Sequence, residues 1–269
     1  MTSRRLVYLG TPEMAVPPLR ALVAAGQDVA LVVTRTDKRR GRGGATSPSP
    51  VKAAALELGL RVSHDLDDVA STGAALGVVV AYGRLVPGAL LGPPLGVPMV
   101  NLHFSLLPRW RGAAPVERAL LAGDRETGVC IMRLVEALDA GPVIASEVVP
   151  IGDRDTAVDL RARLVERSAH LLVQTLAGPL GEGTPQVGDP VYAAKITPDD
   201  LHIDWSAGAV QIDRVVRVGG AWTTFRDRRV RILDTHLDAA AEAASSSALA
   251  IPVPGLCVDR VQPEGRGPM

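Results

Sequence analysis

Residues 97–112 read VPMVNLHFSLLPRWRG, and this stretch decides how the N-terminal part of the chain folds. The run at residues 97–100 is apolar, which predicts a strand that is covered on both faces. Asn101 and His103 follow two residues apart, so their side chains project from the same side of that strand near its C-terminal end. In open α/β sheets, ligands bind just outside those ends. We therefore expect Asn101 and His103 to face a functional site.

Short apolar runs alternate with helical patterns on both sides of this stretch. Expected strands cover residues 6–9, 29–33, 78–81 and 128–134, and expected helices cover residues 17–25, 50–58, 115–121 and 157–176. Strands that alternate with helices predict an α/β fold with a mostly parallel, Rossmann-like sheet and right-handed crossovers.

The character of the chain changes after residue 180. Residues 181–194 are rich in glycine and proline, which predicts a linker. Beyond residue 195, short runs separated by turn signals predict a smaller β-rich domain, and the Ala/Ser-rich residues 239–249 predict a mobile loop. We therefore expect one domain at residues 1–180 and a second at residues 195–269.

The composition excludes several classes of protein. Apolar residues make up 47% of the chain, as in a globular protein, and its 29 basic and 29 acidic residues cancel. A binding site for a charged partner must therefore come from local clustering. Cys130 and Cys257 stand in no paired motif, so we expect two buried, reduced thiols and neither a disulfide nor a metal site. The apolar runs are too short for a membrane span, and we expect a cytoplasmic protein.

A third polar residue, Asp139, follows the strand expected at residues 128–134 and precedes a Gly-Pro turn, so it too can face the sheet edge. Asparagine, histidine and aspartate suit acyl transfer to an amine. The amide donates a hydrogen bond to an oxyanion, the imidazole handles protons, and the carboxylate orients and stabilises the imidazolium. Ser105 lacks the pattern of a nucleophile elbow, so we interpret its hydroxyl as shaping the loop.

The pattern Asn-x-His-x-Ser-Leu-Leu-Pro-x-x-Arg-Gly, followed by Ala-Ala-Pro and later by Leu-Asp-x-Gly-Pro-Val-Ile, resembles the folate-dependent formyltransferase family. The resemblance implies an enzyme that uses 10-formyltetrahydrofolate as the formyl donor and needs no metal. It implies that Asn101, His103 and Asp139 are catalytic. It also implies a folate site formed by Ser105, Leu106, Leu107, Pro108 and Gly112.

Three features resemble the branch of this family that formylates methionyl-initiator tRNA. They are the Gly-Thr-Pro-Glu at residues 10–13, a basic inserted loop within residues 34–52, and an OB-like C-terminal domain. Between residues 214 and 231 that domain has six arginines and one acid. In the loop, glycines flank five basic side chains, which suits contact with phosphates. The side chains expected to bind tRNA are Arg35, Lys38, Arg39, Arg40 and Arg42.

Two alternatives remain open from the sequence. A sugar-nucleotide amine formyltransferase should lack the basic loop, and a catalytically silent RNA-binding module would have the three polar residues misplaced.

The chain also departs from the family pattern: residues 64–78 are short for a helix, residues 218–220 lack a Pro-rich turn, and the chain ends soon after Gln262. We expect a monomer whose partners are folate and tRNA.

Overall fold

The computed structural model describes residues 3–39, 46–93, 96–238, 253–265 and 267, and it separates into two compact units. Unit 1 comprises residues 1–112, 127–149 and 161–192, and unit 2 comprises residues 113–126, 150–160 and 193–269. The loop predicted at residues 239–249 lies outside the described residues. Each unit is therefore assembled from segments that are separate in the sequence.

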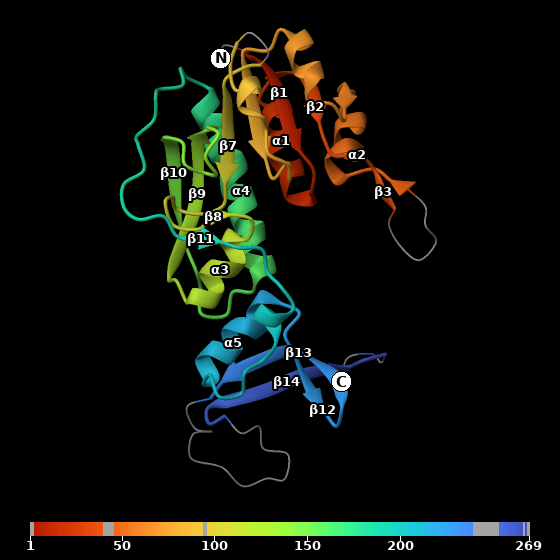
Figure 1. The fold of residues 1–269 in the computed structure, drawn as a ribbon, viewed down its shortest axis with the longest axis vertical. Helices are drawn as coiled ribbons and strands as arrows, with labels where there is room; N and C mark the ends of the chain where they lie inside the picture. The colour runs from red at the N-terminus through yellow and green to blue at the C-terminus, as the bar shows by residue number, and fades with distance from the viewer. Residues whose placement is uncertain (1–2, 40–45, 94–95, 239–252, 266, 268–269) are drawn as a thin grey trace. The chain divides into compact units, whose positions relative to one another are not determined.

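A seven-stranded sheet forms the centre of unit 1 (Figure 1). Its strands are β1 (Arg5–Gly10), β2 (Asp28–Val33), β5 (Val62–Ser63), β6 (Leu76–Val80), β7 (Met99–His103), β9 (Glu126–Arg133) and β10 (Val143–Pro150). They lie in the order β10-β9-β7-β6-β1-β2-β5. The pairs β1–β2, β2–β5, β1–β6 and β6–β7 are parallel, whereas β7 and β9 are antiparallel. The predicted mostly parallel sheet is confirmed.

The four helices expected from the spacing of apolar side chains are found, whereas α5 (Ala209–Val218) was not predicted. In α1 (Val16–Ala24), Val16, Leu19 and Leu22 are buried at helical spacing. The helix α2 (Pro50–Glu57) begins after Ser49, whose Oγ accepts a hydrogen bond from the Lys52 N–H at 3.0 Å. Figure 1 shows α1 and α2 beside the strands β1 and β2. The long helix α4 covers Ala157–Leu176, as predicted, and short 3-10 helices cover Glu13–Ala15, Asp67–Thr72 and Gly88–Leu90.

The core of unit 1 lies on both faces of the central strands. Leu6, Val7, Tyr8 and Leu9 alternate in direction along β1, and all are fully buried. This is the burial expected where both faces of a parallel sheet are covered. The span that seemed short for a helix, residues 64–78, contains the 3-10 helix Asp67–Thr72 instead.

Unit 2 is β-rich, as predicted. Its antiparallel strands β12 (Trp222–Phe225), β13 (Arg228–Leu237) and β14 (Leu256–Pro263) form a sheet in that order. The helix α3 (Pro115–Ala122) packs against α5 (Ala209–Val218), and α5 packs against β13. Both glycines after α5, Gly219 and Gly220, have positive φ, so this turn uses glycine where a Pro-rich turn was expected. A 3-10 helix covers Asp199–Leu201.

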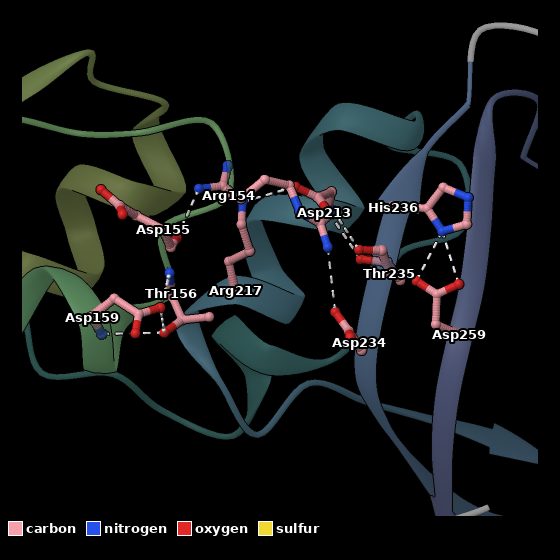
Figure 2. A network of polar contacts seen from close by, with 10 residues as sticks. All are labelled: Arg154, Asp155, Thr156, Asp159, Asp213, Arg217, Asp234, Thr235, His236 and Asp259. Atoms are coloured by element: carbon pink, nitrogen blue, oxygen red, sulfur yellow. Dashed lines mark hydrogen bonds and ion pairs between the residues drawn. The ribbon is translucent and has the colours of Figure 1, made fainter.

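A network of polar contacts lies within unit 2 (Figure 2). Asp213 of α5 is buried, and its carboxylate accepts hydrogen bonds from Arg217 Nε at 2.8 Å and from Thr235 Oγ1 at 2.9 Å. Arg154 Nη1 donates to the Thr235 carbonyl at 2.7 Å, and Arg217 Nη1 donates to the Asp155 carbonyl at 3.1 Å. The network therefore ties the segment before α4 to α5 and β13.

Two short strand pairs lie outside the two larger sheets. The strands β3 (Lys38–Arg39) and β4 (Thr46–Ser47) are antiparallel, and β8 (Arg111–Gly112) pairs with β11 (Tyr192–Ala193). Both cysteines are free, but only Cys130 is buried, so the expectation of a buried Cys257 is wrong. Among the helices of the described residues, none combines the length and the apolar character needed to cross a membrane.

Candidate active site

Asn101 and His103 lie in β7 on the same side of the strand, as the sequence predicted. Asn101 is half-buried and His103 is only 5% exposed. On one side β6 pairs with β7 in parallel, with Val79 opposite Asn101. On the other side β9 runs antiparallel, with Cys130 opposite His103. Both polar side chains are therefore held by a strand with neighbours on each side.

Asp139 reaches these residues from the loop that follows β9. Because β9 is antiparallel, its last residue Arg133 pairs with Val100, before both polar residues of β7. The loop returns so that Asp139 Oδ1 accepts a hydrogen bond from Asn101 Nδ2 at 3.4 Å, and Oδ2 lies 3.7 Å from His103 Nδ1. The predicted convergence of the three side chains is therefore found, although the antiparallel direction of β9 was not foreseen.

The backbone on both sides of Asp139 is shaped for this contact. Asp139 has a φ of 47°, in the left-handed region that aspartate adopts more readily than most residues. Its Oδ2 accepts a hydrogen bond from the Gly112 N–H at 2.8 Å, and Gly112 has a φ of 118°. The Asp139 carboxylate thus joins β7, its own loop and the end of the 105–112 loop.

The orientation of His103 constrains its protonation. Its Nε2 lies 2.8 Å from the Trp110 carbonyl, which only accepts hydrogen bonds. The neutral ring therefore carries its proton on Nε2, and only the imidazolium also presents an N–H at Nδ1 toward Asp139. At 3.7 Å, that Nδ1 must approach the carboxylate by roughly 0.5 Å to reach hydrogen-bonding distance. An N–H at Nδ1 would therefore point at the Asp139 carboxylate.

Ser105 is fully buried, and its hydroxyl closes the loop that carries the predicted folate residues. Its Oγ donates to the Arg109 carbonyl at 2.6 Å and contacts the Trp110 carbonyl at 3.5 Å. A hydroxyl in this position shapes the loop and is shielded from attacking a substrate. The peptide bond between Leu107 and Pro108 is cis. Leu106, Leu107, Pro108 and Gly112 are partly exposed, and Ser105 is not.

Cys130, beside His103 in the sheet, is not poised as a nucleophile. Burial raises the pKa of its thiol, and the hydrogen bond with the Leu107 backbone opposes this only in part. The thiol therefore stays protonated near neutral pH, and the thiolate is the reactive form. Together with the buried Ser105, this favours chemistry without a covalent enzyme intermediate.

Sequence reasoning missed Gln186, whose side-chain amide contacts the backbone of the Asp139 loop and the side chain of Arg111. It lies in the segment predicted to be a linker, and the compact unit 1 extends through this segment to residue 192. The signal was weak, because a single glutamine in a Gly/Pro-rich stretch has no motif around it.

The basic residues expected to contact tRNA are described only in part. Arg35 is half-buried, and its backbone N–H donates to Thr11 Oγ1 at 3.4 Å. The backbone of Lys38 and Arg39 forms β3, and Arg40 and Arg42 lie outside the described residues. Six arginines between residues 214 and 231 were expected to form a second basic region. Of these, Arg217 forms an ion pair with Asp213, whereas the guanidinium carbon of Arg229 lies 4.1 Å from the centre of the Trp222 ring.

One group of side chains in unit 2 has the composition of a metal site. His236, Asp238 and Cys257 each offer a ligand atom within 4.8 Å of the others, which was not foreseen because His236 and Cys257 meet only through the pairing of β13 with β14. The group is only partly buried, and His236 Nδ1 also lies 2.8 Å from Asp259 Oδ1. Metal ions bind such N, O and S ligands. In unit 1, by contrast, Asp139 lies beside Asn101 and His103. These three groups suit proton transfer and the stabilisation of charge.

Two family models match the chain. The model described as formyl transferase matches residues 4–176, and the model described as formyl transferase, C-terminal domain, matches residues 195–269. Together they include every predicted site residue.

Named relatives match over nearly the full length. The methionyl-tRNA formyltransferase of Dinoroseobacter shibae is 44% identical over 97% of this chain and 93% of that protein. The methionyl-tRNA formyltransferase of Clavibacter sepedonicus is 43% identical over 98% of this chain and 94% of that protein.

Solved structures share the fold at low identity. WlaRD, a sugar 3N-formyl transferase solved in the presence of dTDP and 5-N-formyl-THF, is 15% identical with a TM-score of 0.69, over 99% of this chain and 100% of that one. HypX from Aquifex aeolicus, in complex with tetrahydrofolic acid, is 14% identical with a TM-score of 0.68, over 98% of this chain and 45% of that one. These matches support the fold alone, whereas the family models and the relatives decide the family. The chain belongs to the formyl transferase family.

Proposed function

We propose that this enzyme transfers the formyl group of 10-formyltetrahydrofolate to the amino group of methionyl-initiator tRNA. The observation that carries the proposal is the contact of one carboxylate, Asp139, with Asn101, His103 and the Gly112 N–H. Relatives that are 43–44% identical over nearly the whole chain have the name of this activity. The same three residue types are those that acyl transfer to an amine needs.

In the proposed reaction, the neutral amine of the methionyl group attacks the formyl carbon directly. The new C–N bond forms while the carbonyl electron pair moves to oxygen. Asn101 uses one amide N–H for Asp139 and has a second for the oxyanion. His103, with Nε2 bound to the Trp110 carbonyl, contributes its positive charge through Nδ1, and Asp139 orients and supports the imidazolium.

Collapse of the tetrahedral intermediate completes the transfer. The oxyanion re-forms the carbonyl, and the bond between the formyl carbon and N10 of the folate breaks. The amine nitrogen loses one proton and N10 gains one, so protons balance without a net acid or base. His103 or a water molecule carries that proton. The loop from Ser105 to Pro108, together with Gly112, forms the proposed folate site, and no metal takes part.

For tRNA we propose two contact regions. The first is the basic loop with Arg35, Lys38, Arg39, Arg40 and Arg42, whose charges neutralise phosphates. The second is an OB-like domain at residues 195–269, which follows a catalytic domain at residues 1–180 and the connecting residues 181–194. A cavity of about 280 Å³ in unit 2, lined by Arg229, Arg231, Gln262, Pro263, Glu264 and Gly265, supports this second region. We propose that the enzyme acts as a monomer in the cytoplasm, where its tRNA substrate is charged.

The test supplies the purified protein with radiolabelled 10-formyltetrahydrofolate and either methionyl-initiator tRNA or an amino-sugar nucleotide. The proposal predicts label in acid-precipitable RNA and none on the sugar nucleotide. Transfer to the sugar nucleotide alone would establish the alternative enzyme. Binding of tRNA without transfer to either acceptor would establish a silent RNA-binding module. The His103→Ala variant is the matched control for background transfer.

A further inference from the structure

Gln186 lies in a stretch of unit 1 that is otherwise largely exposed to solvent. Thr184, Pro185 and Val187 are exposed, and the Val187 side chain is 84% exposed, whereas Gln186 is half-buried. The stretch is fixed against β10 by two backbone hydrogen bonds of 2.8 Å between Val143 and Thr184. This bridge places Gln186 beside the Asp139 loop, although 47 residues separate the two in the sequence.

The side-chain amide of Gln186 makes four hydrogen bonds. Its Nε2 donates to the Asp139 carbonyl at 2.8 Å and to the Gly141 carbonyl at 2.9 Å. Its Oε1 accepts from Arg111 Nε at 3.0 Å and from Arg111 Nη2 at 2.6 Å. These four bonds use both donor hydrogens and both acceptor lone pairs of the amide.

Only one orientation of this amide is compatible with its neighbours. Carbonyl oxygens only accept hydrogen bonds and the guanidinium only donates them, so exchanging Oε1 and Nε2 would break all four contacts. Methionine, leucine or glutamate at this position would lose the two donors. Gln186 is therefore specific in both its length and its chemistry.

The amide links the two sides of the Asp139 carboxylate. On one side it holds the backbone of Asp139 itself, in its left-handed conformation. On the other it holds Arg111, the residue before Gly112, whose N–H binds Asp139 Oδ2 at 2.8 Å. Arg111 is half-buried, and its guanidinium donates both of these hydrogen bonds to Gln186. A displacement of either side would move the carboxylate relative to Asn101 and His103.

We propose that Gln186 is a positioning residue, which acts through Asp139 and touches neither substrate. The inference rests on the proposed function, because it assigns Gln186 to the same reaction. A misplacement of about 1 Å at a reacting group can lower a rate by about 10²-fold. The segment predicted to be a linker is therefore part of the catalytic apparatus.

The first experiment compares Gln186→Met with Arg133→Met. Arg133 anchors the same segment, because its Nε donates to the Glu182 carbonyl at 3.1 Å and its Nη2 to the Gly181 carbonyl at 2.7 Å, but it makes no side-chain contact with Asp139 among the described bonds. We expect Gln186→Met to lower kcat about 10- to 100-fold with KM for both substrates within about threefold. Arg133→Met should keep kcat within about twofold. Equal kcat losses in the two variants would overturn the proposal.

A double-variant cycle tests whether Gln186 acts through Asp139. Once Asp139→Asn has removed the carboxylate, the further change Gln186→Met should lower kcat by less than about twofold, because coupled residues are not additive. Full additivity of the two losses would overturn the proposal. So would a normal kcat in Gln186→Met that is accompanied only by a lower melting temperature.

A measurement without substrate separates this inference from the proposed function. The Gly112 amide proton is bound by Asp139 Oδ2, so its hydrogen exchange, followed by NMR, reports the position of that carboxylate. The exchange should accelerate at least about tenfold in Gln186→Met and stay unchanged in Arg133→Met. Unchanged exchange in both variants would overturn the inference whatever the acceptor. Failure of the wild-type protein to formylate methionyl-tRNA, with accelerated exchange in Gln186→Met, would overturn only the proposed function.

Discussion

Asp139 in unit 1 is half-buried and Asp213 in unit 2 is buried, and the partners of these two aspartates differ in kind. The Asp213 side chain is 4% exposed and binds Arg217 Nε at 2.8 Å and Thr235 Oγ1 at 2.9 Å (Figure 2). The Asp139 side chain is 10% exposed and binds the Gly112 N–H at 2.8 Å, while His103 Nδ1 stays 3.7 Å away. Each carboxylate accepts two hydrogen bonds, but Asp213 pairs with an arginine, whereas Asp139 faces a histidine that lies beyond hydrogen-bonding distance.

The difference separates a structural carboxylate from a reactive one. Arginine is always charged, so the Asp213 pair has one state and stabilises the fold of unit 2. Histidine changes its charge near neutral pH, so the contact between His103 and Asp139 can strengthen as charge develops during a reaction. Removal of Asp213 should therefore act on stability, and removal of the Asp139 site should act on rate.

The largest effect should come from Asp213→Ala, which leaves the buried side of Arg217 and the Thr235 hydroxyl without their acceptor. Loss of one partner of a buried pair typically costs about 3–5 kcal/mol. The free energy of unfolding from urea titration should fall by this amount, while kcat of the folded fraction stays near normal. The control is Asp234→Ala in the same network, where the side chain is 51% exposed and lies 3.6 Å from Arg154, and a loss below about 1 kcal/mol is expected. Equal losses would mean that burial does not distinguish the two.

His103→Ala should show the opposite behaviour. The residue acts on charge that develops in the transition state, and a group of this kind contributes about 10²–10³-fold to kcat. Steady-state kinetics should show that loss with KM for folate within about threefold, and the free energy of unfolding should change by less than that of Asp213→Ala. A variant with near-normal turnover would remove His103 from the mechanism.

Arg42→Ala tests a charge that is proposed to bind a ligand and not a neighbouring side chain. Loss of one charge-assisted contact should raise KM for tRNA roughly tenfold and leave KM for folate nearly unchanged. The slope of log affinity against log salt should also flatten by about 0.7–0.9. Arg5→Ala is the matched control, because Arg5 pairs with Asp28 at 2.7 Å at the start of β1. Identical salt slopes in the two variants would make the basic loop a solvated run of charge.

The smallest effect concerns Asp200, a partly exposed carboxylate of unit 2. Hydrogen bonds from Arg118, and then from Thr197, lower its pKa from 3.8 to about 2. Because the folded pKa is depressed, the stabilisation is present above pH 3.8 and is lost as the pH falls through about 2. It should amount to less than about 1 kcal/mol, since the pair is near the surface. Urea titrations between about pH 5 and about pH 2 should show a shallower loss of stability with acid for Asp200→Asn than for the wild-type protein. Parallel curves would show that the pair adds nothing.

Much of unit 1 could be predicted from sequence because the deciding signals are local. The period-two spacing of Asn101 and His103 after an apolar run placed both side chains correctly in β7. The helices were found because their apolar residues recur at helical spacing and because proline and glycine mark their ends.

What could not be predicted depends on contacts between distant residues. The antiparallel direction of β9 depends on the pairing of Val100 with Arg133, for which a single sequence has no local signal. Gln186 contacts a loop 47 residues away, and the stretch around it has the composition of a linker. Asp213 and Arg217 are one helical turn apart, but their burial depends on Thr235 of β13.

The most direct test of the account is the single-turnover rate of Asp139→Asn with both substrates saturating. The substitution keeps the shape of the side chain, so its oxygen still accepts a hydrogen bond, but it removes the charge that faces His103. The account predicts formyl transfer at least about 10²-fold slower than in the wild-type protein, with unchanged folate affinity and unfolding free energy. A rate within about threefold of wild type would contradict it, because the Asp139 carboxylate would then be as purely structural as that of Asp213.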